Sequence, residues 1–567
     1  MAPGNEALKP QLVIPMTGIS SRFTSAGYDR PKFMLEVDGQ TVIEHVLDMY
    51  PDWQNVVFIC NGIHLDDARL GLEALLMSRR PAARIVRLDG PVKGPGEAVL
   101  LARDSIARDN KVVVNYCDFT VYWNSDDLIA ALEVDGVEGV IPVYTGFHPH
   151  TVHSTSYAYV CMDGLRAVDI QEKQPWTDNP LGELASTGTY GFSSGALLLD
   201  ALDKQVERGL TLNGEYYLSL TYKSLLAESK RIDVLMVEHF MQWGTPQDFE
   251  EYRDVSRGLR RWIDPRISRD PADVGASCPG RYSRVLLASG AGSRFASAGY
   301  SQPKPVLPLS GGTVMQHALA GIPGVETVVV TRDDLVDHGL IADLAENAGY
   351  SVVTLPVLSR GQAESALAGL RALQSDLPVT VAACDALLSI DSESFDKAVH
   401  LAGTDGIVVW TAPEYPAANR KVEQYGWIAS TSDGDTSDMW LKSEPADPKA
   451  RVMVGTFTFP SRNQAIAAIV ELLESGEQIN GEFYLDSVAR RKFEQGEPVI
   501  PFTTQAYLSV GTPAEYETVR YWQSCFHKWV HHPYSLVADP LVATELRAIL
   551  DHDFRKFTPI LDVGRDR

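Results

Sequence analysis

Residues 16–45 read MTGISSRFTSAGYDRPKFMLEVDGQTVIEH, and residues 288–317 repeat this stretch as ASGAGSRFASAGYSQPKPVLPLSGGTVMQH. Further motifs recur in the same order: NYCDF and AACDA, GTYGF and GTFTF, NGEYYL and NGEFYL, and WGTP and VGTP. A repeat this long is not the period of a solenoid, so each copy is expected to form a domain with its own core. The sequence therefore predicts two domains of one fold.

The composition between and beyond the repeats predicts the domain boundaries. We expect a first domain over residues 10–255 and a second over 283–522. Between them, residues 256–282 are rich in Pro, Gly, Arg and Ser, as is typical of a linker. Residues 523–567 have no counterpart in the first copy and are expected to form a helical C-terminal tail.

Overall composition excludes several classes of protein. The 567 residues are 45% hydrophobic and 22% charged, which indicates packed cores rather than disorder. A net charge of −24 argues against binding nucleic acid through bulk charge, but not against small phosphorylated ligands. The chain has no apolar run of about 18 residues and no signal-peptide pattern at its N-terminus, and its six cysteines form no CxxC pair. We therefore expect a cytoplasmic protein without a membrane span or disulfide framework, and the sequence leaves oligomerisation open.

Apolar runs alternate with helical patterns in each copy. Short runs such as QLVIPM, NVVFIC and KVVVNYC, and RVLLAS, ETVVVT and LPVTVAAC in the second copy, have the length of buried strands. Stretches such as DDLIAALEV lie between them and are typical of helices. This alternation predicts an α/β fold, with a Rossmann-like, mostly parallel central sheet covered by helices on both faces. Ligands of such sheets bind at the carboxyl ends of the strands.

A loop rich in Gly and Ser follows the first predicted strand of each copy. It ends in Arg22 in the first copy and in Arg294 in the second, and a Pro-Lys pair with Lys32 or Lys304 follows ten residues later. Small residues allow backbone N–H groups to approach a phosphate closely, and the Arg and Lys add positive charge. The spacing differs from that of a P-loop, in which the Lys directly follows the glycines. The predicted nucleotide-binding residues of these loops are Gly18, Ser20, Ser21, Gly290, Gly292 and Ser293.

Taken together, these motifs resemble those of the sugar-phosphate nucleotidylyltransferases, which have a GT-A-like Rossmann fold. The resemblance covers residues 10–255 and 283–520, and the later motifs Glu-Lys-x-Pro, GTYGF, GEYYL and GTP agree with it. Members of the family bind a nucleoside triphosphate and Mg²⁺. A phosphate oxygen of the acceptor attacks the α-phosphorus, and pyrophosphate leaves. The resemblance therefore implies an NTP, a phosphorylated small-molecule acceptor and Mg²⁺ as ligands.

By this resemblance, the site residues of the first copy have separate roles. Arg22 and Lys32 would hold triphosphate oxygens, Asp118 would ligate Mg²⁺, and Lys173 would hold the acceptor phosphate beside Glu172, which contacts sugar hydroxyls. In the second copy Arg294, Lys304 and Asp385 match the first three positions. The remaining acceptor-side residues implied by the shared motifs are Gly188, Glu215, Gly455 and Glu482.

Both copies depart from the family pattern. The first has Ser20 where the second has Gly292, which makes a close backbone approach to the triphosphate less certain in the first copy. The second copy has KSEP at residues 442–445 against EKQP at 172–175, so its acceptor Lys is expected to be displaced by one position. Gln242 and Ser509 stand where many members have an Asp as a second metal ligand, and both are poorer Mg²⁺ ligands. The first copy is thus the better candidate for an active acceptor site, and the second is either another activity or a degenerate regulatory partner.

A histidine cluster in the first copy lies in the stretch that lines the acceptor pocket in the family. His148, His150 and His153 could bind an anionic acceptor, could lie on a plain surface loop, or could bind a metal ion. We interpret His148 and His150 as acceptor-binding residues. The second copy lacks the cluster, which predicts that the two copies do not share an acceptor.

Two further loops correspond to the base-reading loop of the family. Gly94 and Glu97 lie in the first, and Gly361 and Glu364 in the second. A carboxylate facing the base would favour an amino donor, as in cytosine or guanine. Alternatively, both Glu residues belong to the first turn of the following helix, where acids are favoured.

The leading hypothesis is a Mg²⁺-dependent nucleotidyltransferase with two tandem domains, active in the synthesis of nucleotide sugars or surface-polysaccharide precursors. One alternative is a cytidylyltransferase for a non-sugar phosphate or phosphonate. Another is a non-catalytic nucleotide-sensing subunit. A glycosyltransferase is disfavoured because neither Asp118 nor Asp385 is part of an Asp-x-Asp motif.

Overall fold

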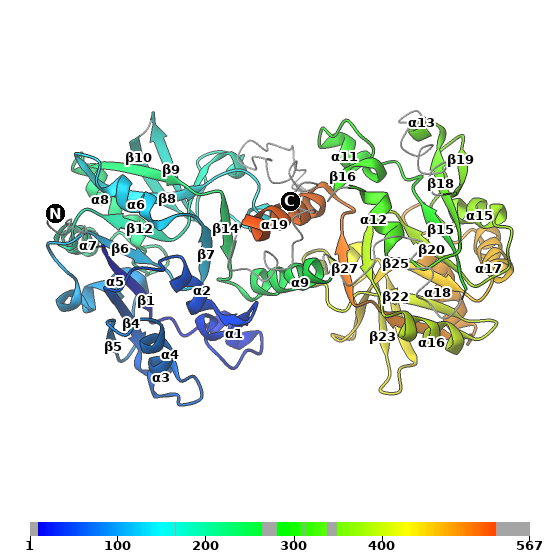
Figure 1. The fold of residues 1–567 in the computed structure, drawn as a ribbon, viewed down its shortest axis with the longest axis horizontal. Helices are drawn as coiled ribbons and strands as arrows, with labels where there is room; N and C mark the ends of the chain where they lie inside the picture. The colour runs from blue at the N-terminus through cyan, green and yellow to red at the C-terminus, as the bar shows by residue number, and fades with distance from the viewer. Residues whose placement is uncertain (1–8, 165, 263–280, 310–311, 337–348, 529–567) are drawn as a thin grey trace, which may run out of the picture. The chain divides into compact units, whose positions relative to one another are not determined.

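The computed structural model describes residues 9–164, 166–262, 281–309, 312–336 and 349–528, and within them the chain divides after Tyr252 into two compact units (Figure 1). Helix α9 (Pro246–Trp262) spans this division, so the first part of the predicted linker is helical. The rest of that linker lies outside the described residues. Helix α19 (Pro513–Lys528) includes the start of the predicted C-terminal tail, and residues 529–567 of that tail are likewise outside the described part.

The main sheet of the first unit runs in the order β10-β9-β11-β8-β12-β6-β1-β4-β5, and β13 also pairs with β8. Strands β6, β1, β4 and β5 are parallel, whereas β12, β11, β9 and β10 pair with their neighbours in an antiparallel manner. The strands are β1 (Gln11–Met16), β4 (Val56–Asn61), β5 (Arg84–Leu88), β6 (Val112–Asn115), β8 (Val137–Tyr144), β9 (Ala158–Asp163), β10 (Arg166–Glu172), β11 (Leu184–Ser186), β12 (Thr189–Phe192) and β13 (Arg231–Met236).

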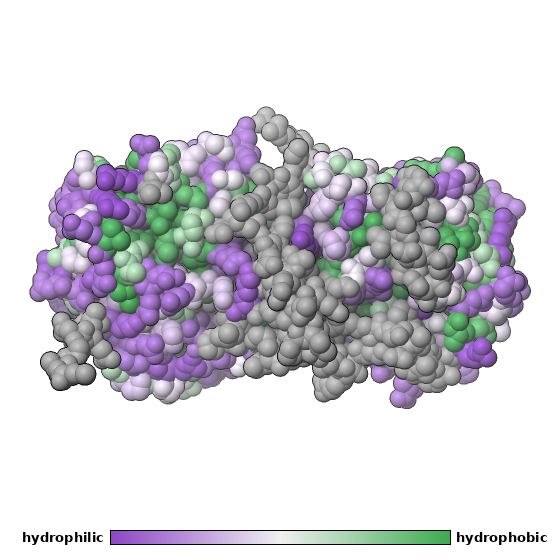
Figure 2. Space-filling model, turned by 45° about the horizontal axis from the view of Figure 1, so that its top comes forward, coloured by the Kyte–Doolittle hydropathy of each residue, from purple (hydrophilic) through white to green (hydrophobic). Residues whose placement is uncertain are grey.

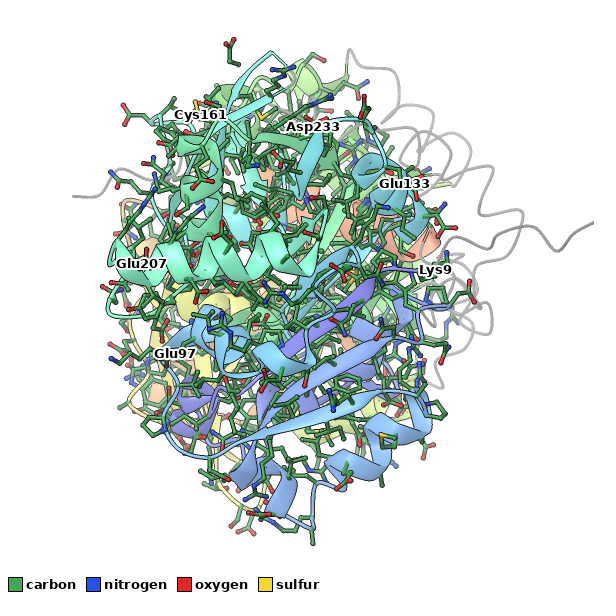
Figure 3. The ribbon with its side chains drawn as sticks, turned by 90° about the vertical axis from the view of Figure 1, so that its left-hand side faces the viewer. Lys9, Glu97, Glu133, Cys161, Glu207 and Asp233 are labelled. Carbon is green, nitrogen blue, oxygen red and sulfur yellow. The ribbon has the colours of Figure 1, made fainter. Side chains whose placement is uncertain are left out.

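Helices cover both faces of this sheet because successive residues of its buried strands point to opposite sides. In β1, Leu12 and Ile14 belong to one hydrophobic core and Val13 to the other. The first core includes residues of α2 (Val42–Asp48), α4 (Leu72–Arg79) and α6 (Ser125–Leu132). The second includes residues of α5 (Gly94–Leu101), α7 (Gly195–Glu207) and α8 (Thr221–Ala227). In Figure 3, which labels Glu207 on α7, this helix lies across the sheet.

The second unit repeats this arrangement. Its sheet runs β19-β18-β15-β20-β25-β22-β26, with β23 paired to β24 and β25. The strands are β15 (Ser283–Leu287), β18 (Glu326–Arg332), β19 (Ser351–Leu355), β20 (Val379–Ala383), β22 (Ile407–Thr411), β23 (Gly426–Ser430), β24 (Thr436–Leu441), β25 (Arg451–Phe459) and β26 (Val499–Thr503). The helices are α11 (Ser293–Ser297), α12 (Val314–Ala320), α13 (Asp333–Val336), α15 (Gln362–Ala372), α16 (Ser392–Ala402), α17 (Arg462–Ser475) and α18 (Leu485–Glu494).

The predicted α/β class, with a Rossmann-like sheet in each of two domains, is confirmed. In each unit the phosphate loop and the loop with the Mg²⁺-ligand candidate leave adjacent parallel strands, β1 and β6 or β15 and β20. Their carboxyl ends lie at one edge of the sheet. A two-stranded ribbon closes this edge, formed by β7 (Phe119–Tyr122) with β14 (His239–Gln242), or by β21 (Ala386–Ser389) with β27 (Ala506–Ser509).

The surface of the described residues is mostly polar, and their helices are not of the membrane-spanning kind. On the face shown in Figure 2, hydrophilic residues surround small hydrophobic patches in both units. No helix in the described part of the chain is both long enough and apolar enough to cross a membrane. The five cysteines within the described ranges are free thiols.

Candidate active sites

The phosphate loops of the two units share one backbone conformation. Ser20 lies in the left-handed region with φ 56° and ψ 38°, and Gly292 lies there with φ 65° and ψ 16°. The hydroxyl oxygen of Ser20 accepts a hydrogen bond from the backbone N–H of Lys32 at 3.1 Å, which ties the loop to the Pro-Lys turn. Replacement of glycine by serine has therefore preserved the loop in the first unit, although left-handed backbone is strained for a residue with a Cβ.

The carbonyl groups of these loops are contacted by side chains at the end of the neighbouring strand or just after it. His64, in α3 (Gly62–Asp66), has its Nε2 atom 3.2 Å from the Gly18 carbonyl oxygen, and Arg332 donates to the Gly290 carbonyl at 2.9 Å. A Cβ built on Gly18 or Gly290 would meet no atom within 4 Å. Both loops thus border open space on the side where the sequence predicts a nucleotide.

A Lys–Asp ion pair lies beside each loop. Lys32 Nζ is 2.6 Å from Asp118 Oδ2, and Lys304 Nζ is 2.5 Å from Asp385 Oδ2. Burial alone lowers the pKa of each ammonium, but the adjacent carboxylate more than offsets this, so the net pKa of both lysines is raised. Burial likewise opposes ionisation of Asp385, and Lys304 nevertheless holds the pKa of that carboxyl below its usual value. The structure thus brings together the predicted triphosphate Lys and the predicted metal ligand in both units.

The positions of the expected second metal ligand lie next to these aspartates. A Cβ built on Gly244 would lie 2.8 Å from Asp118 Oδ2 and 2.9 Å from Gln242 Nε2, so the two side chains converge there. In the second unit, the Cβ of Gly511 would lie 3.1 Å from Asp385 Oδ2 and 3.5 Å from Glu515 Oε2. Glu515 is a residue that the sequence analysis missed, because it lies in the first turn of α19 rather than at the motif position.

These residues fit a Mg²⁺ ion that takes few ligands from the protein. The described residues include no group of three or more His, Cys, Asp or Glu side chains that could hold a metal. Mg²⁺ commonly binds through one or two carboxylates and completes its shell with substrate phosphates and water. Asp118, and Asp385 with Glu515 beside it, suit that mode rather than an all-protein metal site.

The two predicted base-reading loops pack against the NGE motifs. Gly96 N–H donates to the Tyr216 carbonyl at 2.8 Å, and Ala363 N–H donates to the Phe483 carbonyl at 3.0 Å. Gly361 has φ 129°, and a Cβ there would lie 2.6 Å from Phe483 N. Glycine is required at this position because the two backbones approach so closely.

The structure shows what the carboxylates of Glu97 and Glu364 contact within their own loops. The Glu97 carboxylate accepts the backbone N–H of Lys93 at 2.5 Å, and that of Glu364 accepts the N–H of Arg360 at 2.6 Å. Both acids lie in the first turn of a helix, α5 or α15, where they bond N–H groups that have no partner within the helix. Figure 3 labels Glu97 near the start of α5. The alternative of a first-turn acid therefore describes both residues.

Lys173 is the residue predicted to bind the acceptor phosphate in the first unit. It directly follows β10, has φ 58°, and its backbone N–H donates to the Tyr157 carbonyl at 2.8 Å. Its ammonium donates to the Tyr217 hydroxyl at 2.7 Å, and that hydroxyl donates to Glu215 at 2.6 Å. Burial and the Glu215 carboxylate raise the pKa of Tyr217. The predicted residues Lys173 and Glu215 are thus linked through one tyrosine.

Lys442 occupies the same place in the second unit, which corrects the predicted displacement of this Lys. It directly follows β24, has φ 53°, and its N–H donates to the Tyr425 carbonyl at 3.1 Å. Its ammonium lies 5.2 Å from the centre of the Tyr484 ring, the counterpart of Tyr217, and donates to the Gln424 carbonyl at 2.6 Å. Burial and Glu482 raise the pKa of Tyr484 to about 12. The second unit therefore has a lysine in the place that Lys173 takes in the first.

Two adjoining cavities mark the site of the second unit. The larger, of about 550 Å³, is lined by the phosphate loop, Arg294, Lys304 and Glu482. The smaller, of about 190 Å³, is lined by Lys442 and by Gly455 of the GTFTF motif. Arg294 and Asp385 line both. Since they share these residues, the two cavities adjoin at Asp385, one beside the predicted nucleotide-binding loop and the other beside Lys442. In the first unit the Gly188 carbonyl accepts the N–H of Tyr116 at 3.1 Å.

His148 and His150 do not form an acceptor pocket, which corrects their predicted role. His148 is fully buried and packs on the ring of Tyr144, and His150 is 5% exposed and packs on the rings of Tyr144 and Tyr157. Burial lowers the pKa of His148 to about 3, so the ring is neutral at physiological pH. Neutral side chains inside an aromatic cluster stabilise the fold and present no charge to an anion. Tyr144 and Tyr157 are close in sequence, but the ring of Phe240 in β14, which stacks on Tyr144 and contacts His150, comes from a distant segment that no local pattern indicates.

A glycine-rich loop, a Lys–Asp pair at the carboxyl edge of a parallel sheet, and a second lysine beyond it together define a nucleotidyltransferase. Residues 12–178 and 284–501 match the family of the MobA-like NTP transferase domain, so each unit contains one copy. The chain belongs to this family. A comparison with curated proteins found no match.

Among solved structures, the chain is similar to a nucleoside-diphosphate-sugar pyrophosphorylase from Vibrio cholerae, with 23% identity over 43% of this chain and 99% of that one and a TM-score of 0.36. It is also similar to the inositol-1-phosphate CTP transferase from T. maritima, with 14% identity over 42% of this chain and 91% of that one and a TM-score of 0.34. A third similar structure is a UDP-glucose pyrophosphorylase from Acinetobacter baumannii, with 18% identity over 44% of this chain and 94% of that one and a TM-score of 0.34.

Proposed function

We propose that the chain is a Mg²⁺-dependent nucleotidyltransferase that joins an NTP to a sugar phosphate or related phosphorylated acceptor and releases pyrophosphate. The products would serve as nucleotide sugars or surface-polysaccharide precursors, made in the cytoplasm, where NTPs are found. The observation that carries the proposal is the equivalent placement, in both units, of the Lys–Asp pair beside the glycine-rich loop and of Lys173 or Lys442 beyond it. For this reason we propose that both units are catalytic.

The side chains divide the reaction between two ends of the site. Lys32 with Arg22, or Lys304 with Arg294, binds triphosphate oxygens, and Asp118 or Asp385 would hold the metal ion. Bound Mg²⁺ neutralises charge on the triphosphate and so favours attack at the α-phosphorus. Lys173 or Lys442 orients the acceptor phosphate, whose oxygen forms the new bond to the α-phosphorus. The bond from that phosphorus to the β-phosphate oxygen breaks, and pyrophosphate leaves with the bonding electrons. Positioning and charge neutralisation supply most of the catalysis in such transfers.

Pyrophosphate release tests the proposal directly. The full chain is incubated with each of the four NTPs, Mg²⁺ and a panel of phosphorylated acceptors that includes sugar 1-phosphates, with EDTA-treated samples as the control. We expect release with at least one pair, and loss of that release on chelation. Measurable NTP binding without release from any pair would contradict the proposal and favour a nucleotide-sensing subunit.

A further inference from the structure

The acceptor ends of the two units differ at three positions that contact one another. In the first unit Glu172 of β10 pairs with Ala158 of β9, and in the second Leu441 of β24 pairs with Gly426 of β23. Strand register therefore aligns Leu441 with Glu172, and Gly426 with Ala158. A third pair is Ser219 and Asp486, which each lie four residues after the glutamate of the NGE motif.

In the first unit the strand supplies the carboxylate. Ser219 lies in the 3₁₀ turn Leu218–Leu220, and its hydroxyl donates to Glu172 Oε2 at 2.5 Å. This contact shows that the strand position and the turn position face each other across the acceptor end. Burial raises the pKa of Glu172, against the effect of the bond from Ser219 and the charge of Lys173.

In the second unit the carboxylate comes from Asp486, which lies at the position of Ser219 rather than on the strand. Asp486 lies in the first turn of α18, is 7% exposed, and lines the smaller cavity together with Lys442. Within the described residues, no side chain donates a hydrogen bond to the Asp486 carboxylate. Leu441, at the strand position, is partly buried and packs against the hydrophobic core of this unit.

Gly426 makes room for this second arrangement. A Cβ built on Gly426 would lie closest to Met453 Cε and 2.8 Å from Asp486 Oδ2, so both side chains occupy the space that the glycine leaves. The first unit has Ala158 at this position, where Ser219 is smaller than an aspartate. Across these three positions each unit thus has one carboxylate. It lies on the strand in the first unit (Glu172, the strand wall) and on helix α18 in the second (Asp486, the helix wall), while the lysine stays in place.

We infer that Asp486 is the acceptor-selecting residue of the second unit, and that its position on the helix wall makes this unit bind a different phosphorylated acceptor from the first. The inference rests on the proposed function. The acceptor of the second unit carries a phosphate, which Lys442 binds, and a hydrogen-bond donor placed to meet Asp486. Hydroxyl and ammonium groups both supply such a donor.

The first experiment measures acceptor preference in one unit at a time. Lys32→Ala silences the first unit and Lys304→Ala the second, and each variant is assayed for pyrophosphate release with hexose 1-phosphate, hexosamine 1-phosphate, inositol phosphate and phosphoethanolamine. We expect different rankings of kcat/KM in the two variants, and the four compounds distinguish hydroxyl from ammonium donors. Identical rankings would overturn the inference but leave the proposed function intact.

The second experiment changes the carboxylate. On the Lys32→Ala background, Asp486→Asn is expected to lower kcat/KM for the preferred acceptor at least about tenfold, because a hydrogen bond to a charged group is lost, with the KM for NTP unchanged. Asp433→Asn, in the exposed turn between β23 and β24, is the matched control. An unchanged acceptor KM in Asp486→Asn would contradict the inference.

A third measurement needs no turnover. Calorimetric titration of the same four acceptors into the full chain and into Asp486→Asn reads acceptor binding alone, so it tests Asp486 even if no pyrophosphate is released. We expect the variant to lose at least about tenfold in affinity for one acceptor. Equal affinities for all four compounds would overturn the role of Asp486.

Discussion

The backbone N–H of Lys442 donates to the Tyr425 carbonyl at 3.1 Å, and that of Lys173 donates to the Tyr157 carbonyl at 2.8 Å. Both lysines have positive φ, which directs the chain in the same way after the strand. We therefore predict that Lys442→Ala, on the Lys32→Ala background, raises the KM for the acceptor at least about tenfold, since a charge-assisted contact to phosphate is lost. The KM for NTP is expected to stay unchanged.

Ser443→Ala is the matched control, because alignment of the KSEP and EKQP motifs places Ser443, not Lys442, opposite Lys173. Ser443 is exposed, and its variant is expected to behave like the parent chain. The prediction fails if Ser443→Ala impairs acceptor use and Lys442→Ala does not.

Removing the ammonium of the Lys–Asp pair should weaken nucleotide binding. We expect Lys304→Ala to lower the affinity of the second unit for NTP about 10- to 100-fold, which corresponds to one lost hydrogen bond between charged groups. Calorimetric titration of NTP with Mg²⁺ measures the affinity. Lys397→Ala removes an exposed ammonium that pairs with Glu393 on α16, and it should leave the affinity unchanged. Unaltered binding in Lys304→Ala would exclude this lysine from the nucleotide site.

Ser20 combines a strained backbone with a favourable hydrogen bond. Ser20→Ala keeps the strain and loses the bond to Lys32 N–H, so we expect the free energy of unfolding of the first unit to fall by about 1 kcal/mol. Ser20→Gly loses the same bond but relieves about 1 kcal/mol of left-handed strain, so its stability should be close to that of the parent. Urea denaturation measures both variants. Equal losses in the two would show that the backbone at position 20 is not strained.

Replacement by alanine should have different effects at two glycines of the second unit, on stability at one and on NTP binding at the other. In Gly361→Ala the new Cβ would lie 2.6 Å from Phe483 N and O, at φ 129°, so we expect a loss of at least about 2 kcal/mol in unfolding free energy. Gly290 lines the larger cavity, and a Cβ there meets no atom. Gly290→Ala should therefore leave stability unchanged and weaken NTP binding. Denaturation and calorimetry separate the two effects, and a reversed pattern would place the nucleotide elsewhere.

Burial of His148 predicts acid sensitivity of the first unit. Its folded pKa is about 3 against 6.5 for an exposed imidazole, so the unfolded chain binds the proton first as pH falls. The contribution of His148 is thus fully present above pH 6.5 and is lost toward pH 3, at about 1.4 kcal/mol per pH unit. Urea midpoints between pH 7.5 and 5 measure this slope. His148→Gln should flatten it, whereas His153→Gln, at an exposed position, should not.

The sequence was sufficient to predict the α/β class and two domains of one fold, because strand and loop order determine which loops reach the carboxyl edge of a parallel sheet. The contact between Lys32 and Asp118 agrees with the roles that the family resemblance implies for them. The sequence did not predict that Lys442 takes the place of Lys173. The β23–β24 hairpin is one residue longer than β9–β10 between the paired Tyr and Lys, and antiparallel pairing, not motif spacing, sets where the strand ends. Burial of His148 was not predicted for a different reason, since the cluster around Tyr144 and His148 is completed by Phe240 from a distant strand.

The exchange of Glu172 and Ser219 for Leu441 and Asp486 also constrains how the two halves diverged after duplication. Starting from the arrangement of the first unit, an aspartate on the helix wall collides with the Cβ of an alanine on the neighbouring strand. Losing the strand glutamate first leaves none of the three positions with a carboxylate. Replacing the alanine with glycine first costs some strand stability, but it removes the collision and keeps a carboxylate at these positions throughout.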